Sequence, residues 1–131
     1  MGIAMPLHWK IAPLEQMVVC VSEGVVTKDE LLAYFKALEE AGAAHYRKML
    51  DASRAECHLT PAEIAELAAY AKSLKGQGTP GPMAIFTGST GNDAFVRSIS
   101  TLLRPGRRLR TFSTIHAARR WLDSARLGRS S

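Results

Sequence analysis

Two capping boxes, each following a strand-like run, most constrain how this chain folds. In the segments 27–30 and 60–63, a threonine side chain can accept a bond from the backbone N–H of a glutamate, and the glutamate can bond back to the threonine N–H. The second box also has Pro61 at the first helical position, where a missing N–H costs nothing. The runs 17–21 and 46–50 precede these helix starts. A strand followed by a helix, repeated, is typical of an α/β domain.

The unit of a strand followed by a helix is repeated to the end of the chain. We expect strands at 9–11, 17–21, 46–50, 83–87 and 109–112, and helices that begin at Thr27, at Thr60, after the turn 88–91 and at Ser113. Helical spacing marks the residues that should be buried: Leu31, Tyr34, Phe35, Leu38, Ile64, Leu67, Ala68, Ala71, Leu74, Ala94, Phe95, Ile99, Ile115, Ala118, Trp121 and Leu122. Helical connections make consecutive strands parallel.

The expected architecture is therefore α/β, a mostly parallel β-sheet of about five strands with four α-helices. It forms a single domain over residues 1–131, with an ordered core at about 6–124 and a flexible C-terminal tail at 125–131. Gly24 interrupts the second strand pattern and indicates a bulge or bend. The glycine- and proline-rich segment 76–82 ends the second helix.

Composition indicates a globular protein of the cytoplasm. The chain has 131 residues, of which 47% are hydrophobic and 22% charged, and no apolar run is long enough to span a bilayer. Cys20 and Cys57 are too few for a disulfide framework, which favours a reduced compartment. Residues 1–6 lack the basic start and apolar region of a signal peptide.

Positive charge is concentrated in the last quarter of the chain. From Arg104 to Arg129 eight arginines stand against one acid, whereas residues 1–103 carry nine Lys/Arg and eleven Asp/Glu. The densest part is a basic patch formed by Arg104, Arg107, Arg108 and Arg110. This patch is either a solvated loop or a contact for phosphates, an acidic partner or an anionic membrane surface. Nucleic acid is disfavoured because interleaved aromatic residues and a reading helix are missing.

Three sequence features together resemble the STAS family, the sulphate-transporter and anti-sigma-factor-antagonist fold. They are the valine-rich strand with Glu23-Gly24 before the Thr27 helix, the strand ending at Asp51 before the Thr60 helix, and Phe112-Ser113 leading to the helix that contains 117–122. The likeness is to the anti-sigma-factor-antagonist-like, STAS-like bacterial branch. It implies sequentially ordered strands with helices mainly on one side. It also implies another protein as partner, such as a regulator or a kinase-like protein, and a homodimer.

The resemblance also directs attention to Ser53. Family regulators carry a phosphorylatable serine directly after an aspartate, in a D-S-S-G-L motif that opens a helix. In this chain Asp51 matches the aspartate, Ala52 stands at the phosphoacceptor position, and 54–56 replaces Gly-Leu. Ser53, one residue later, is the phosphoacceptor candidate that remains.

A second candidate site is the turn formed by Gly88, Ser89, Thr90, Gly91 and Asn92. It lies between an expected strand and a helix N-terminus, where free N–H groups and the helix dipole favour an anion. It lacks the lysine of a P-loop and the spacing of a dinucleotide-binding fingerprint. The alternative is a plain turn with Thr90 and Asp93 as a helix cap. With Asp51, this turn forms the candidate anion- or ligand-binding site.

No other constellation indicates catalysis. The four histidines, at 8, 45, 58 and 116, are scattered, and neither metal-ligand spacing nor a base paired with Cys57 is evident. We therefore expect no cofactor and no metal.

The leading hypothesis is a non-enzymatic regulatory module that presents a sheet face, or the loops after Leu50 and Thr87, to another protein. The alternative is a carrier of a small ligand or lipid, with an apolar pocket lined by the strand 83–86 and by Phe95. The third is an anion- or nucleotide-binding protein, or an enzyme that uses Asp51, Ser53 and Ser89.

Overall fold

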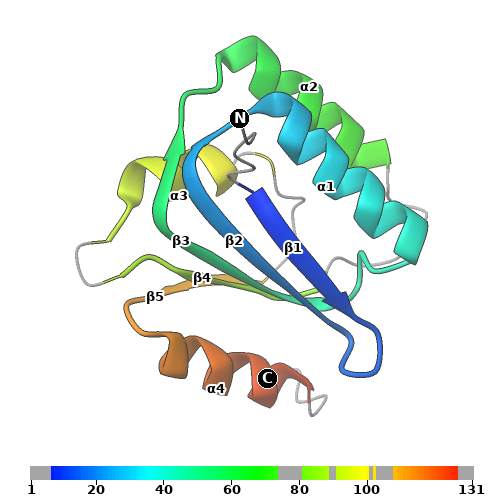
Figure 1. The fold of residues 1–131 in the computed structure, drawn as a ribbon, viewed down its shortest axis with the longest axis vertical. Helices are drawn as coiled ribbons and strands as arrows, with labels where there is room; N and C mark the ends of the chain where they lie inside the picture. Colours follow the sequence, from blue (N-terminus) through cyan, green and yellow to red (C-terminus); the bar gives the residue numbers. More distant parts are fainter. Residues whose placement is uncertain (1–6, 74–80, 89–90, 101, 103–107, 127–131) are drawn as a thin grey trace, which may run out of the picture.

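A computed structural model describes residues 7–73, 81–88, 91–100, 102 and 108–126 of the chain (Figure 1). The strands in this part are β1 (Leu7–Ala12), β2 (Met17–Val26), β3 (Arg47–Cys57), β4 (Met83–Phe86) and β5 (Leu109–Phe112). The helices are α1 (Lys28–Ala41), α2 (Pro61–Lys72), α3 (Asp93–Ser100) and α4 (Ile115–Arg126). The α/β class, the five-stranded sheet and the four helices predicted from the sequence are thus confirmed.

The strands follow one another across the sheet in chain order, β1-β2-β3-β4-β5. β2 to β5 are parallel, and each crossover contains a helix. β1 pairs antiparallel with β2 because only residues 13–16 connect them, which is too short for a crossover. A hydrogen bond of 3.1 Å from the Gln16 N–H to the Pro13 carbonyl closes this turn.

The helices are divided unequally between the two faces of the sheet (Figure 1). α1, α2 and α3 cover one face and enclose the larger core, which includes Leu31, Leu67, Ile85 and Phe95. α4 packs on the opposite face, against β3 and β4, around a smaller core formed by Met17, Met49, Ala84, Ala118 and Leu122. On this second face, β1 and the part of β2 after Met17 have no described helix over them.

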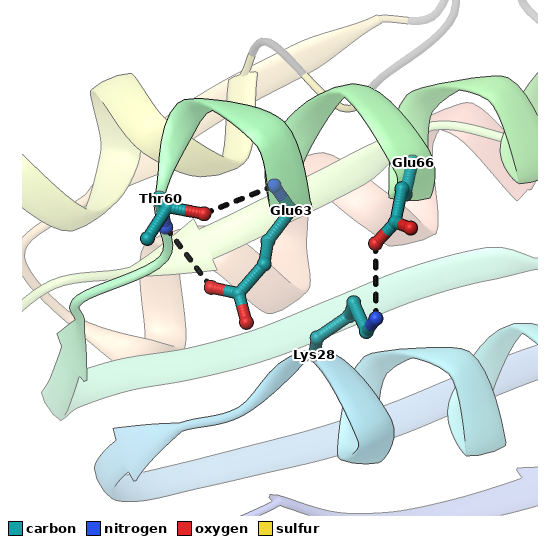
Figure 2. A network of polar contacts seen from close by, with 4 residues as sticks. All are labelled: Lys28, Thr60, Glu63 and Glu66. Carbon is teal, nitrogen blue, oxygen red and sulfur yellow. Dashed lines mark hydrogen bonds and ion pairs between the residues drawn. The ribbon is translucent and has the colours of Figure 1, made fainter.

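Both predicted capping boxes are present. The Thr60 N–H donates to the Glu63 carboxylate at 3.0 Å, and the Glu63 N–H donates to the Thr60 hydroxyl at 3.1 Å (Figure 2). The box at the start of α1 has the same two bonds. Figure 2 also shows the 2.9 Å ion pair between Lys28 and Glu66, which joins α1 to α2. α1 ends at Gly42, as predicted, in the left-handed conformation that glycine adopts without strain.

Three local predictions were wrong. β3 runs to Cys57 instead of ending near residue 50, because Glu23–Val26 of β2 continue beyond the predicted strand and pair with 54–57. The cap of α4 is Thr114, whose hydroxyl accepts from the Ala117 N–H at 3.1 Å, and not Ser113. Ala94 and Ile115 are exposed, since each lies in the first turn of its helix and points away from the core.

Several predicted features lie outside the described residues: Leu74, the segment 76–80, Ser89, Thr90, Arg104 and Arg107. α4 continues to Arg126, so it includes the first two residues of the predicted tail, and 127–131 also lie outside the described part.

Two adjacent cations at the start of β3 are buried, which the sequence did not indicate. Lys48 is 2% exposed, and its ammonium group donates to the carbonyls of Ala43, Ala44 and Tyr46 at 3.4, 2.7 and 2.8 Å. These carbonyls form the turn after α1, whose last turn contains no basic residue. The lysine therefore supplies the positive charge that a helix C-terminus favours.

Arg47 points to the opposite face of the sheet and is 7% exposed. Its guanidinium donates to the Leu122 carbonyl at 3.1 Å, to the Glu15 carbonyl at 2.9 Å and to the Asp123 carboxylate at 3.4 Å. The arginine thus joins β3, the β1–β2 turn and the C-terminal end of α4.

Replacing Lys48 with methionine should lower the free energy of unfolding by about 2–4 kcal/mol, because buried carbonyls lose their donor. Urea denaturation followed by circular dichroism measures this change. Lys36→Met, at an exposed position of α1, is the matched control and should leave the midpoint nearly unchanged. Equal midpoints for the two variants would show that the lysine does not stabilise this turn.

Candidate functional site

A β-bulge in β3 organises the candidate site. Val21 pairs with Asp51 and Glu23 pairs with Arg54, so the single residue Ser22 lies opposite both Ala52 and Ser53. Ala52 is fully buried and Ser53 is exposed. Such an extra residue leaves backbone groups without ladder partners, and they must bond elsewhere.

The Asp51 side chain accepts hydrogen bonds from the bulged residue Ser53. Its carboxylate oxygen Oδ1 accepts from the Ser53 backbone N–H at 3.1 Å and from the Ser53 hydroxyl at 2.8 Å. The short side chain of an aspartate often accepts a hydrogen bond from the backbone N–H two residues later, and this bond stabilises irregular turns. The Ser53 hydroxyl is therefore held in one orientation at the surface.

The Asn92 side chain donates hydrogen bonds to backbone carbonyls of the bulged segment. Its side-chain amide donates to the Ala52 carbonyl at 2.8 Å and to the Ala55 carbonyl at 2.9 Å. Asn92 also immediately precedes α3, and its own carbonyl accepts from the Val96 N–H at 3.0 Å. One residue thus starts a helix and fixes the bulge of a neighbouring strand.

These bonds bring the turn after β4 against the bulge. Gly88 has φ of 80°, and a Cβ atom placed there would lie 3.3 Å from the Ser53 Cβ. Of the predicted site residues, Asp51, Ser53, Gly88 and Asn92 therefore come together. Gly91 lies in the same turn, where its N–H donates to the Gly88 carbonyl at 3.3 Å.

A polar hollow of about 290 Å³ opens beside the bulge. It is lined by Val21, Ser22, Glu23, Asp51, Ser53 and Arg54. The Arg54 guanidinium lies 3.9 Å from the Glu23 carboxylate across its rim. Ser22 is 1% exposed, and its hydroxyl has no partner among the described residues. Sequence reasoning missed Ser22, Glu23 and Arg54; the glycine at 24 was the nearest signal, because it indicated an irregular strand.

The two described arginines of the basic patch do not belong to the site at the bulge. Arg108 and Arg110 are exposed and belong to the region of β5, which β4 separates from β3. Their guanidinium carbons lie 5.7 and 5.9 Å from the centre of the Trp121 ring, and Arg110 is also 5.3 Å from the Phe112 ring. The basic patch, as far as the structure describes it, is thus a separate surface stacked on aromatic rings.

An apolar cavity of about 80 Å³ lies in the larger core, between the sheet and the helices α1, α2 and α3. Met83 and Phe95, which were expected to line a pocket, both contribute to its wall. Other wall residues include Cys20, Tyr34, Lys48 and Ile99.

Cys20 cannot act as a thiolate at neutral pH, since burial raises its pKa to about 12. Among the residues that the structure describes, no three His, Cys, Asp or Glu side chains gather in a way that could hold a metal ion. The described helices also include none with the length and apolar character needed to cross a membrane. The arrangement at the bulge offers polar contacts of both signs and one oriented hydroxyl group.

Comparison with known proteins gives no assignment. No protein-family model matches the chain, and no curated protein matches it either.

Asn92→Ala should lower the free energy of unfolding by about 1–3 kcal/mol, because the Ala52 and Ala55 carbonyls lose their donor. Amide hydrogen exchange should become faster at residues 52–55 in the same variant. Thermal unfolding and exchange mass spectrometry measure the two effects. Ser100→Ala, at an exposed position of α3, is the control. Unchanged exchange at the bulge would contradict the role given to Asn92.

Proposed function

We propose that this protein is a non-enzymatic regulatory module of STAS-like type that acts in the cytoplasm by binding another protein. Support comes from the sequential order of the strands and from the helices that lie mainly on one side. Asp51 adds to it, because it lies within β3 directly before the bulge that holds Ser53. The observation that carries the proposal is the joining of the bulge to the Gly88–Asn92 turn at one rim of the sheet.

The uncovered part of the sheet adds an apolar surface to this rim. Val19 and Val25 on β2 are 37% and 41% exposed, and Val21 between them lines the hollow. A polar hollow flanked by exposed aliphatic side chains suits a protein partner, because apolar contacts supply affinity and the charges supply orientation. The same surface could also join two copies of the chain as a homodimer.

Ser53 is the residue through which this surface would be regulated. Its hydroxyl is exposed and donates to Asp51. When a kinase-like partner holds ATP, the Ser53 oxygen would attack the γ-phosphorus and the Asp51 carboxylate would accept its proton. The bond from the γ-phosphorus to the bridging oxygen would break, and ADP would leave. A phosphate on Ser53 would enter a hollow lined by the carboxylates of Asp51 and Glu23 and by the Arg54 guanidinium. Repulsion from Asp51 together with attraction to Arg54 would then rearrange the bulge and change the surface offered to the partner.

Affinity capture with the purified chain tests the proposal. A specific partner should be enriched by the wild-type chain, reduced at least about tenfold by Val19→Lys and by Ser53→Glu, and retained by the control Ser100→Glu. Size-exclusion chromatography with light scattering then gives the stoichiometry, alone and with the captured partner. A strictly monomeric chain whose captured proteins are the same for all four forms would refute the proposal.

The second candidate function is the binding of a small apolar ligand, which the core cavity favours. A volume of about 80 Å³ is smaller than the roughly 150 Å³ cavity that accommodates benzene, so only a few carbon atoms fit without movement of the wall. A larger ligand would require α1 or α3 to shift outward.

Native mass spectrometry of the protein purified under mild conditions tests this second function. A co-purifying apolar molecule should be present with the wild-type chain and lost with Ile99→Trp, which fills the cavity. The conservative variant Ile99→Leu is the control and should keep the ligand. If each of the three proteins has only the mass of its own chain, with no ligand added, the carrier function is contradicted.

A further inference from the structure

We propose that the open edge of β5 and the arginines beside it bind an extended acidic segment of a partner protein by strand addition. This site is separate from the hollow beside β2 and β3, so either proposal can fail while the other stands.

Within the part of the chain that the structure describes, one edge of β5 has no strand beside it. β5 is the last strand of the sheet, and among the described residues only β4 pairs with it (Figure 1). The carbonyls of Arg108 and Phe112 accept from the N–H groups of Met83 and Thr87, each at 2.9 Å. Because strand residues alternate in direction, the N–H and C=O groups of Leu109 and Thr111 point away from β4. They present two donors and two acceptors to an added strand.

The side chains along this edge select the charge of the added strand. Arg108 and Arg110 are both exposed, and both stack near the Trp121 ring, at 5.7 and 5.9 Å. Stacking on an aromatic ring holds a guanidinium in place while its N–H groups stay available to carboxylates. Asp123, the one acid of α4, lies 3.4 Å from Arg47. Positive charge therefore dominates this edge.

The same arginines disfavour pairing of this edge with β5 of a second copy of the chain. Two copies of this edge would place arginines against arginines, which is unfavourable, whereas an acidic strand would be attracted. A nucleic acid has no backbone amides to pair with Leu109 and Thr111. The described surface near Trp121 is also already covered by guanidinium groups, which leaves less ring area for base stacking. An acidic polypeptide uses both the edge and the arginines.

Fluorescence anisotropy with a labelled synthetic peptide of alternating glutamate and valine tests the site. The wild-type chain should bind this peptide, and should bind a peptide of alternating lysine and valine at least about tenfold more weakly. The double variant Arg108→Glu/Arg110→Glu should lose binding, and Arg97→Glu, at an exposed position of α3, should retain it.

Thr111→Pro separates strand addition from simple attraction of anions. Proline removes the N–H that points away from β4, so the pairing of β5 with β4 keeps its own bonds. This variant should bind the acidic peptide roughly tenfold more weakly, whereas Thr111→Ala should stay within about twofold of the wild type.

Three outcomes would overturn the proposal. They are the absence of peptide binding by the wild-type chain, equal binding by Thr111→Pro and Thr111→Ala, and tighter binding of single-stranded DNA or phosphatidylserine vesicles than of the peptide. If Thr111→Pro does not fold, amide exchange of the wild-type chain decides instead. Exchange at Leu109 and Thr111 should slow when the acidic peptide is added, and unchanged exchange would refute strand addition.

Discussion

The adjacent buried cations Arg47 and Lys48 join β3 to the turn after α1, to the β1–β2 turn and to the end of α4. Neighbouring residues of a strand point to opposite faces, so one cation reaches the turn after α1 and the other reaches α4 and the β1–β2 turn. A charge removed from water costs several kcal/mol unless hydrogen bonds compensate it. Both terminal nitrogens of Arg47 are bonded, whereas its buried Nε has no partner among the described residues. The carbonyls must therefore lie where these two side chains can reach them, which restricts how the helices can be placed on the sheet.

The same strand carries the bulge that creates the candidate site. In a regular β3, the side chains of Ser53 and Arg54 would point to opposite faces of the sheet. The Ala52 carbonyl would then be bonded by the ladder and would need no side chain as a partner. The extra residue changes this, because Asp51 and Asn92 must then supply bonds that the ladder cannot. The hollow and the contact with the turn after β4 both follow from that single insertion.

The two proposed surfaces differ in their chemistry. The hollow combines both signs of charge with exposed valines, whereas the edge of β5 presents backbone groups and arginines that stack on Trp121. They lie on different strands of one sheet, with β4 between β3 and β5. If both proposals hold, the two surfaces would bind two different proteins.

The sequence by itself determined the features that depend on residues close together in the chain. Both capping boxes and the Gly42 helix end were predicted, because their bonds join residues a few positions apart. Apolar runs in the sequence located all five strands, although β2 and β3 continue well beyond their predicted ends. The choice between Ser113 and Thr114 as a helix cap was wrong because two adjacent residues of similar chemistry compete for one position.

Only the tertiary structure decided the rest. The second half of β3 exists because β2 lies beside it, and a pattern such as Ser53-Arg54-Ala55-Glu56 does not by itself favour a strand. The burial of Lys48 and the bonds from Asn92 to β3 depend in the same way on groups that the fold brings near. A hydrogen bond between neighbouring residues can be predicted from the short segment that contains both partners. A buried charge or a bulge is stable only when segments distant in the sequence supply its partners.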